Sequence, residues 1–126
     1  MVILDTNIII DHLRQHASRD SLLSKLLHTV KLDEIAISMI TIQELFAGQS
    51  TKDEEILKQI LAILAPFRVL PYTWEVARMA GEIDRDQKRP VSFADVAIAA
   101  TAIINGARFF TLDKKDFQNI KDLELF

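Results

Sequence analysis

Short aliphatic runs alternate along the chain with longer stretches whose apolar positions recur at helical spacing. The short runs are rich in β-branched and aromatic residues and are bounded by turn-forming residues, which is typical of strands. The run at residues 35–40 also carries β-branched residues at alternate positions, as a strand requires. The predicted strands are residues 2–4, 35–40, 67–70, 108–112 and 123–126.

Apolar residues at a spacing of three and four predict helices between these strands. In residues 52–65 they fall on one face of a helix that ends at Pro66. Residues 92–104 are small and apolar almost all round, which places their helix in the interior against a sheet. The other predicted helices are approximately residues 6–15, 18–30, 41–48, 73–88 and 115–117. Strands that alternate with helices predict an α/β fold with a central parallel sheet, and the length fits one domain, residues 1–126.

The composition narrows the functional classes. Hydrophobic residues make up 49% and charged residues 26% of the chain, an ordinary globular balance. The absence of cysteine excludes disulfides, cysteine zinc sites and thiol nucleophiles. The first ten residues lack the features of a signal peptide, and no apolar run approaches the roughly 18–20 residues of a membrane span. We therefore expect a cytoplasmic protein without membrane contact.

The net charge of −3 argues against a broad basic face that grips nucleic acid. It is compatible with an enzyme that reaches phosphates through metal ions held by acids. The carboxylates are therefore the candidate functional residues.

Acidic residues stand where predicted strands end or predicted helices begin. Asp5 and Asp113 directly follow strands, Glu44 lies just past the strand at 35–40, and Asp95 opens the helix at 92–104. In an open parallel sheet the groups beyond the carboxyl ends of the strands share one edge, where ligands bind. We expect these carboxylates to converge there.

Each carboxylate also has a purely structural explanation. Glu44 and Asp95 each stand third after a threonine or serine, as in a capping box, and Asp113 fits a turn. Asp5 is the hardest to explain in this way, because it lies between apolar runs and a buried, unpartnered carboxylate is costly. The sequence alone leaves both interpretations open for each acid.

A cluster of carboxylates has definite chemical consequences. The charges repel one another, so their pKa values rise unless a cation neutralises them. Oxygen ligands without neighbouring histidine or cysteine suit Mg²⁺ or Mn²⁺ rather than zinc. Such ions bind phosphate oxygens and lower the pKa of a bound water, which indicates phosphodiester or phosphoryl chemistry.

Four short motifs, taken in order, resemble those of the PIN-domain ribonucleases. They are Asp5-Thr6-Asn7 after a strand, Thr41-x-x-Glu44, the run from Asp95 to Ala102, and the run from Thr111 to Phe117. None is specific alone, but their order and spacing match from residue 3 to the end. The size and the start of the chain look like VapC, the toxin of VapBC toxin–antitoxin pairs.

This resemblance implies a three-layer α/β/α fold and an endoribonuclease that depends on Mg²⁺ or Mn²⁺. By this match Asp5, Glu44, Asp95 and Asp113 are the catalytic acids and metal ligands, with Glu44 acting through a water or a second ion. Asp116 competes with Asp113 for the fourth place, although a surface turn suits it better.

The resemblance also implies a mechanism and partners. A metal-bound water would attack the scissile phosphate of RNA in line and leave 5′-phosphate and 3′-hydroxyl ends. Thr6, Asn7 and Thr111 would orient the carboxylates. A cognate antitoxin would bind in a groove beside the acids. The amphipathic segments 20–30 and 52–65 would form that groove or a homodimer face, or else plain core.

Three other functions compete with this interpretation. The first is a PIN-like RNA- or protein-binding module without catalysis, which the complete set of acids argues against. A haloacid-dehalogenase phosphatase needs a second aspartate two residues after the first, where this chain has Asn7. A receiver-like phosphoacceptor domain needs paired acids and a lysine after the last strand, a pattern that fits poorly.

The remaining polar and aromatic residues carry weaker signals. The histidines are expected on the surface or on helix faces, because none stands at the predicted strand edge. Some basic residues fit a rim that receives the RNA backbone, although cations also suit helix ends. Trp74 and Tyr72 fit base stacking, but packing is the commoner fate of such aromatics. The histidines are His12, His16 and His28, and the basic residues are Arg14, Arg85, Lys88 and Arg89.

Overall fold

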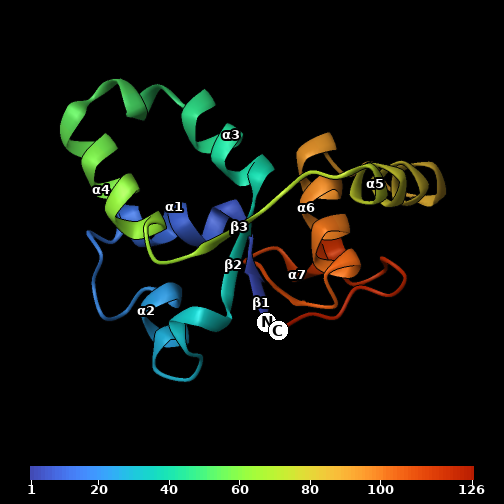
Figure 1. Cartoon of the computed structure of the whole chain (residues 1–126), viewed down its shortest axis with the longest axis horizontal. Helices are drawn as coiled ribbons and strands as arrows, with labels where there is room; N and C mark the ends of the chain where they lie inside the picture. Colours follow the sequence, from blue (N-terminus) through green and yellow to red (C-terminus); the bar gives the residue numbers. More distant parts are fainter.

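The centre of the fold is a parallel sheet of four strands in the order β3-β2-β1-β4 (Figure 1). In this computed structural model, which describes residues 1–126, the strands are β1 (Val2–Leu4), β2 (Ile35–Ser38), β3 (Arg68–Leu70) and β4 (Arg108–Phe110). Leu4 at the end of β1 pairs with Ile37 on one side and Phe110 on the other. β1 is therefore an inner strand, and the residue after it emerges at the middle of the carboxyl edge.

Helices cover both faces of the sheet. α5, α6 and α7 lie on one side, and α1, α2 and α4 lie on the other (Figure 1). The helices are α1 (Thr6–Arg14), α2 (Leu22–Leu27), α3 (Met39–Ala47), α4 (Glu54–Leu64), α5 (Trp74–Asp86), α6 (Phe93–Ile104) and α7 (Lys114–Phe117), with 3₁₀ turns at Leu32–Glu34 and Gln49–Lys52. This arrangement confirms the three-layer α/β/α fold with a central parallel sheet.

The core follows from the alternation of side chains along the strands. Ile3 packs into the apolar cluster beneath α5 and α6, whereas Val2 and Leu4 pack into the cluster beneath α1, α2 and α4. All three side chains are almost completely buried. Burial of an aliphatic side chain of this size contributes about 1.5–3 kcal/mol, so the edge that carries the site rests on a well-packed strand.

α6 is an interior helix, as its sequence predicts. Ala97, Ala99 and Ala100 are fully buried, and α5 packs along α6. Small side chains let the helix approach the sheet closely, because no bulky group separates the two layers. The first turn of α6 is thereby held against the carboxyl edge of the sheet.

The structure differs from the predicted elements at two places that matter. α3 begins at Met39, because the Ser38 hydroxyl accepts a hydrogen bond from the Ile40 amide at 3.1 Å and caps the helix. The predicted strand at 35–40 therefore ends two residues early. The predicted strand at 123–126 is reduced to a single bridge between Phe109 and Leu125.

The second helix is also shorter than predicted. It spans only Leu22–Leu27, with Ser21 as its cap.

No helix in the structure has the length and apolar character needed to cross a membrane.

Candidate active site and metal centre

The predicted carboxylates do lie at the carboxyl edge of the sheet, brought there by different elements. Asp5 directly follows β1 and caps α1, and its amide donates to the Phe110 carbonyl at 2.8 Å. Glu44 belongs to α3, which begins where β2 ends, and Asp95 lies in the first turn of α6. Asp113 follows β4 and precedes α7.

Asp5 is the buried member of the group, with 3% of its surface exposed. The Thr6 amide donates to its Oδ1 at 2.8 Å, and the Thr111 hydroxyl donates to its Oδ2 at 2.7 Å. Burial nevertheless raises the pKa of Asp5 to about 6, and the negative charges of Asp95 and Glu44 raise it further against those two hydrogen bonds. Asp5 is in no ion pair.

Asp95 joins the two halves of the cluster. Partial burial raises its pKa, and the charges of Asp113 and Asp116 raise it as well, while the Ser92 hydroxyl lowers it. The charge of Asp95 therefore raises the pKa of Asp5, and the acids of the β4–α7 segment raise the pKa of Asp95. The carboxylates form a continuous electrostatic group centred on Asp95.

Glu44 is held by two threonines. The Thr6 hydroxyl donates to Glu44 Oε1 at 2.6 Å, and the Thr6 and Thr41 hydroxyls lie 3.1 Å apart. Because a hydroxyl has one proton, Thr41 supplies the proton of the second contact. The capping-box interpretation of Glu44 is wrong, since Ser38 caps α3 and Glu44 lies beyond the first turn. Its position is explained by Thr6, not by the helix start.

Asn7 fastens Asp113 to the rest of the site. Its amide nitrogen donates to Asp113 Oδ2 at 3.2 Å and to the Thr111 hydroxyl at 3.3 Å. Its carbonyl oxygen accepts from the Leu112 amide at 3.3 Å. Asp116 is exposed on α7 and has no comparable hydrogen bond to this network. The preference for Asp113 over Asp116 therefore has a structural basis, although its role stays a prediction.

The donor set fits a hard divalent cation. All the donors are oxygens, the charges are not neutralised by lysine or arginine, and the pKa of Asp5 is raised by burial and, to a smaller extent, by its negative neighbours. No three acidic or histidine side chains are arranged to hold a single ion. Mg²⁺ usually keeps several waters and is bound by only one or two carboxylates together with substrate phosphates, so it does not need such a cage.

The histidine and aromatic predictions have mixed outcomes. His12 was expected on the surface or a helix face but is buried, with Nδ1 at 2.7 Å from the Ser21 hydroxyl, and burial lowers its pKa. Trp74 is 72% exposed rather than packed. Sequence reasoning missed Phe93, which is 78% exposed two residues before Asp95. Its position beside a helix cap was the only signal that it faces solvent.

Comparison with known proteins identifies the family of this chain. Residues 2–123 match the PIN domain. The chain belongs to the PIN-domain family. Within that family the expected likeness to VapC is confirmed: the chain is 33% identical to ribonuclease VapC10 of Mycobacterium tuberculosis, an alignment that covers 98% of this chain and 91% of the relative.

Other members of the PIN-domain family agree. Ribonuclease VapC19 of M. tuberculosis is 31% identical, with 98% of each chain covered. The solved structure of VapBC2 from Rickettsia felis, bound to a DNA fragment from its promoter, superposes with a TM-score of 0.86 at 27% identity and covers 100% of this chain and 98% of that one. The fold is thus that of a VapC-type PIN domain.

Proposed function

We propose that this PIN-domain protein is a metal-dependent endoribonuclease and the toxin of a toxin–antitoxin pair. The observation that carries the proposal is the buried Asp5, whose pKa is raised first by burial and further by the charges of Asp95 and Glu44, with no basic side chain to neutralise them. Holding these carboxylates together costs the folded state free energy, which indicates that their charges serve a function. Membership of the VapC group supplies the reaction class.

One or two of the carboxylates of Asp5, Asp95 and Asp113 would bind Mg²⁺ or Mn²⁺ directly, and Glu44 would act through a water of the ion. When bound, such an ion polarises the scissile phosphate and makes a coordinated water a better nucleophile. The products would carry 5′-phosphate and 3′-hydroxyl ends.

The protein's own groups orient these carboxylates. Thr111 and the Thr6 amide fix both oxygens of Asp5, and Thr6 occupies one oxygen of Glu44. The second oxygen of Glu44, Oε2, is left to accept a proton from a water. Because these donors come from the chain itself, the site is organised before substrate arrives.

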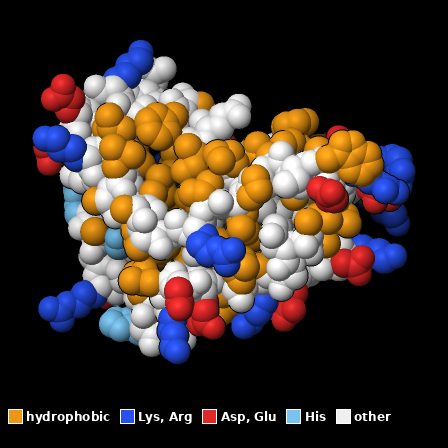
Figure 2. Space-filling view, in the orientation of Figure 1, with side chains coloured by type: hydrophobic (Ala, Val, Ile, Leu, Met, Phe, Trp, Pro, Cys, Tyr) orange, Lys and Arg blue, Asp and Glu red, His pale blue; other side chains and the backbone are white.

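An antitoxin would cover the exposed apolar surface between the α3–α4 and α5–α6 sides. Figure 2 shows hydrophobic side chains gathered across this part of the molecule. The exposed apolar side chains of these elements include Met39, Phe46, Leu61, Trp74 and Phe93. Such a patch on one protein marks a partner surface. A homodimer would use the same surface, and light scattering of the protein with and without its antitoxin separates the two.

Cleavage of RNA in the presence of Mg²⁺ tests the nuclease. We expect Asp5→Ala and Asp95→Ala to abolish cleavage while the circular dichroism of the folded protein is retained. Asp84→Asn, a surface change on α5, serves as the control and keeps activity. Cleavage at the wild-type rate by either site variant would refute the assignment and favour a binding module without catalysis.

A further inference from the structure

A polar groove runs beside Asp95, between the end of α5 and α7. Its volume is about 930 Å³, and Val91 is its one hydrophobic lining residue. A pocket for a small apolar ligand is lined mainly by hydrophobic side chains, so this groove suits a highly charged ligand instead. We call it the α5–α6 groove, after the helices whose connecting loop lines it, and its charged lining residues are Asp86, Lys88, Arg89, Asp95, Lys115 and Asp116.

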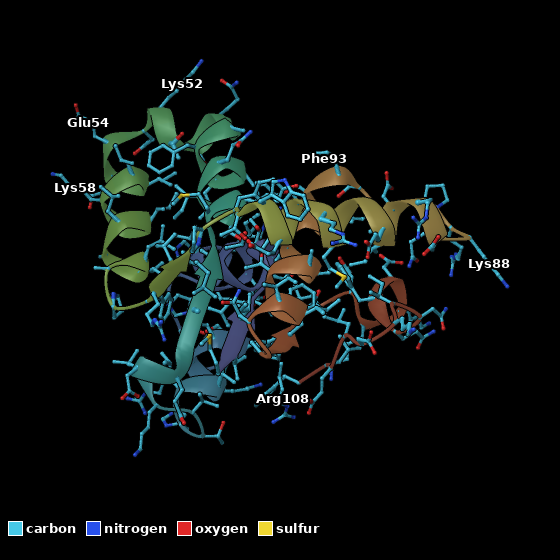
Figure 3. All side chains as sticks on the ribbon, turned by 45° about the vertical axis from the view of Figure 1, so that its right-hand side comes forward. Lys52, Glu54, Lys58, Lys88, Phe93 and Arg108 are labelled. Atoms are coloured by element: carbon cyan, nitrogen blue, oxygen red, sulfur yellow. The ribbon has the colours of Figure 1, made fainter.

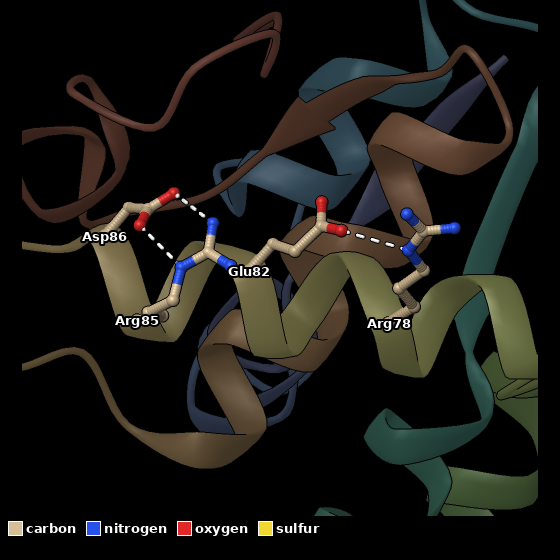
Figure 4. A network of polar contacts seen from close by, with 4 residues as sticks. All are labelled: Arg78, Glu82, Arg85 and Asp86. Carbon is tan, nitrogen blue, oxygen red and sulfur yellow. Dashed lines mark hydrogen bonds and ion pairs between the residues drawn. The ribbon is translucent and has the colours of Figure 1, made fainter.

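The cations of the groove are free of ion pairs, whereas those along α5 are not. Arg85 donates to both oxygens of Asp86 at 2.8 and 3.0 Å, and Arg78 donates to Glu82 at 3.0 Å (Figure 4). The chain's other ion pair, Arg108–Glu124, lies away from the groove. The unpaired cations of the groove are Lys88, Arg89 and Lys115.

The charge of the groove is therefore divided in space. Arg85 already neutralises Asp86, and the remaining acids, Asp95 and Asp116, belong to the carboxylate group where a divalent cation would sit. The free cations stand on the loop beyond α5 and on α7. Lys88 projects from that loop at the far end of the molecule, opposite Lys52 and Lys58 on the α4 side (Figure 3).

We propose that Lys88, Arg89 and Lys115 bind the phosphates of a single-stranded RNA segment that adjoins the scissile phosphate. The strand would run from the acids through the α5–α6 groove, across the loop at residues 87–91. This inference rests on the proposed nuclease function. Lysine and arginine are the usual phosphate partners, and a flexible single strand can bring its backbone down to a half-buried carboxylate such as Asp95.

Binding without cleavage provides the test. The full-length protein is titrated in EDTA with a fluorescein-labelled single-stranded oligouridylate, and anisotropy is followed between about 50 and 200 mM salt. Each phosphate contact contributes about 0.7 to the slope of log affinity against log salt, which is about fivefold in affinity near 0.1 M. We expect Lys88→Gln, Arg89→Gln and Lys115→Gln each to lose about fivefold, and the triple variant to lower the slope by about 2.

Two matched controls separate this groove from general charge effects. Arg78→Gln removes a cation of α5 that is paired with Glu82 and does not line the groove, and Lys58→Gln removes one on the opposite side of the molecule. Both variants should have nearly the wild-type slope, because they change only a charge far from the bound strand. Lys88→Arg keeps the cation and should bind as the wild type does, unlike Lys88→Gln. All these side chains are exposed, so the fold is not at risk.

The outcomes of this test and of the nuclease test are distinguishable. A triple variant that binds RNA with wild-type affinity and slope refutes the proposed RNA-binding role of the groove, even if the protein cleaves RNA. Loss of antitoxin binding with RNA binding intact also overturns it, because the cations would then serve a protein partner. If the slope drops as expected but the protein cleaves no RNA with Mg²⁺, RNA binding by the groove is supported and the nuclease function is refuted.

Discussion

Asp5→Asn should stabilise the metal-free protein at neutral pH while it destroys the site. The pKa of Asp5 is raised from its ordinary value of 3.8 to about 6, a difference of about 2.2. At 1.36 kcal/mol per unit, the ionised side chain costs the folded state about 3 kcal/mol at pH 7. An uncharged residue of the same shape removes that cost.

The gain is partly offset by a lost hydrogen bond. Thr6 and Thr111 donate to the two oxygens of Asp5, and asparagine has one oxygen to offer them. One unmade bond costs about 1 kcal/mol, which leaves a net gain of about 2 kcal/mol. For 126 residues at about 2.1 cal/mol/K each, this corresponds to a rise in Tm of roughly 8 °C.

The sign of the pH dependence follows from the direction of the shift. Since the folded pKa of Asp5 lies above the unfolded one, the destabilisation is full above about pH 6 and vanishes as the pH falls below 3.8. The advantage of Asp5→Asn should therefore be lost near pH 4. Burial lowers the pKa of His12, and this opposes the trend in both proteins, so the difference between them isolates Asp5.

Thermal unfolding in EDTA at several pH values measures this difference. Asp84→Asn should change Tm little, as surface substitutions generally stay within about 0.5 kcal/mol. Mg²⁺ should raise the Tm of the wild type more than the Tm of Asp5→Asn, because the variant lacks the carboxylate that the ion would bind and neutralise. If Asp5→Asn is less stable than the wild type at pH 7 and follows the same pH curve, the electrostatic account of Asp5 fails.

Three further predictions follow from the contacts of the site and its support. Thr111→Val removes a hydrogen bond that lowers the pKa of Asp5, so the acidic limb of the pH–rate profile should move to higher pH; an unmoved limb would separate Thr111 from Asp5. His12→Ala leaves the buried Ser21 hydroxyl without its imidazole partner, and urea unfolding should show a loss of about 1–3 kcal/mol with cleavage per folded molecule unchanged. Gly106→Ala places a side chain at a φ of 61° and should cost about 1 kcal/mol by the same assay, with no effect on RNA binding.

Hydrophobic periodicity was enough to predict an α/β fold with a central parallel sheet, because each strand and helix has its own pattern of apolar positions. The three layers were expected only from the resemblance to PIN domains. Periodicity could not locate the start of α3. The alternation from Ile35 to Ile40 looks like one strand, and the cap depends on the Ser38 side chain turning to the Ile40 amide. That local hydrogen bond competes with extension of the strand, and the two are indistinguishable from residue types alone.

The site shows the same limit at longer range. Convergence of the carboxylates follows from sheet topology, so Asp5 and Asp95 could be named in advance. The Thr6–Glu44 bond and the burial of His12 against Ser21 depend on how separate elements dock. Likewise, Arg85 and Lys88 have similar sequence contexts, and only the structure distinguishes the paired cation from the free one.

The contact between Thr111 and Asp5 spans 106 residues of chain, which orders events during synthesis. At about 5–20 residues per second, roughly 5 to 20 seconds separate the translation of the two residues. Until β4 has emerged to pair with β1, the first strand lacks one of its neighbours and Asp5 lacks the hydroxyl that fixes it. A nascent or prematurely terminated chain therefore carries an unassembled centre, and the hazard to the cell begins only with the last part of translation.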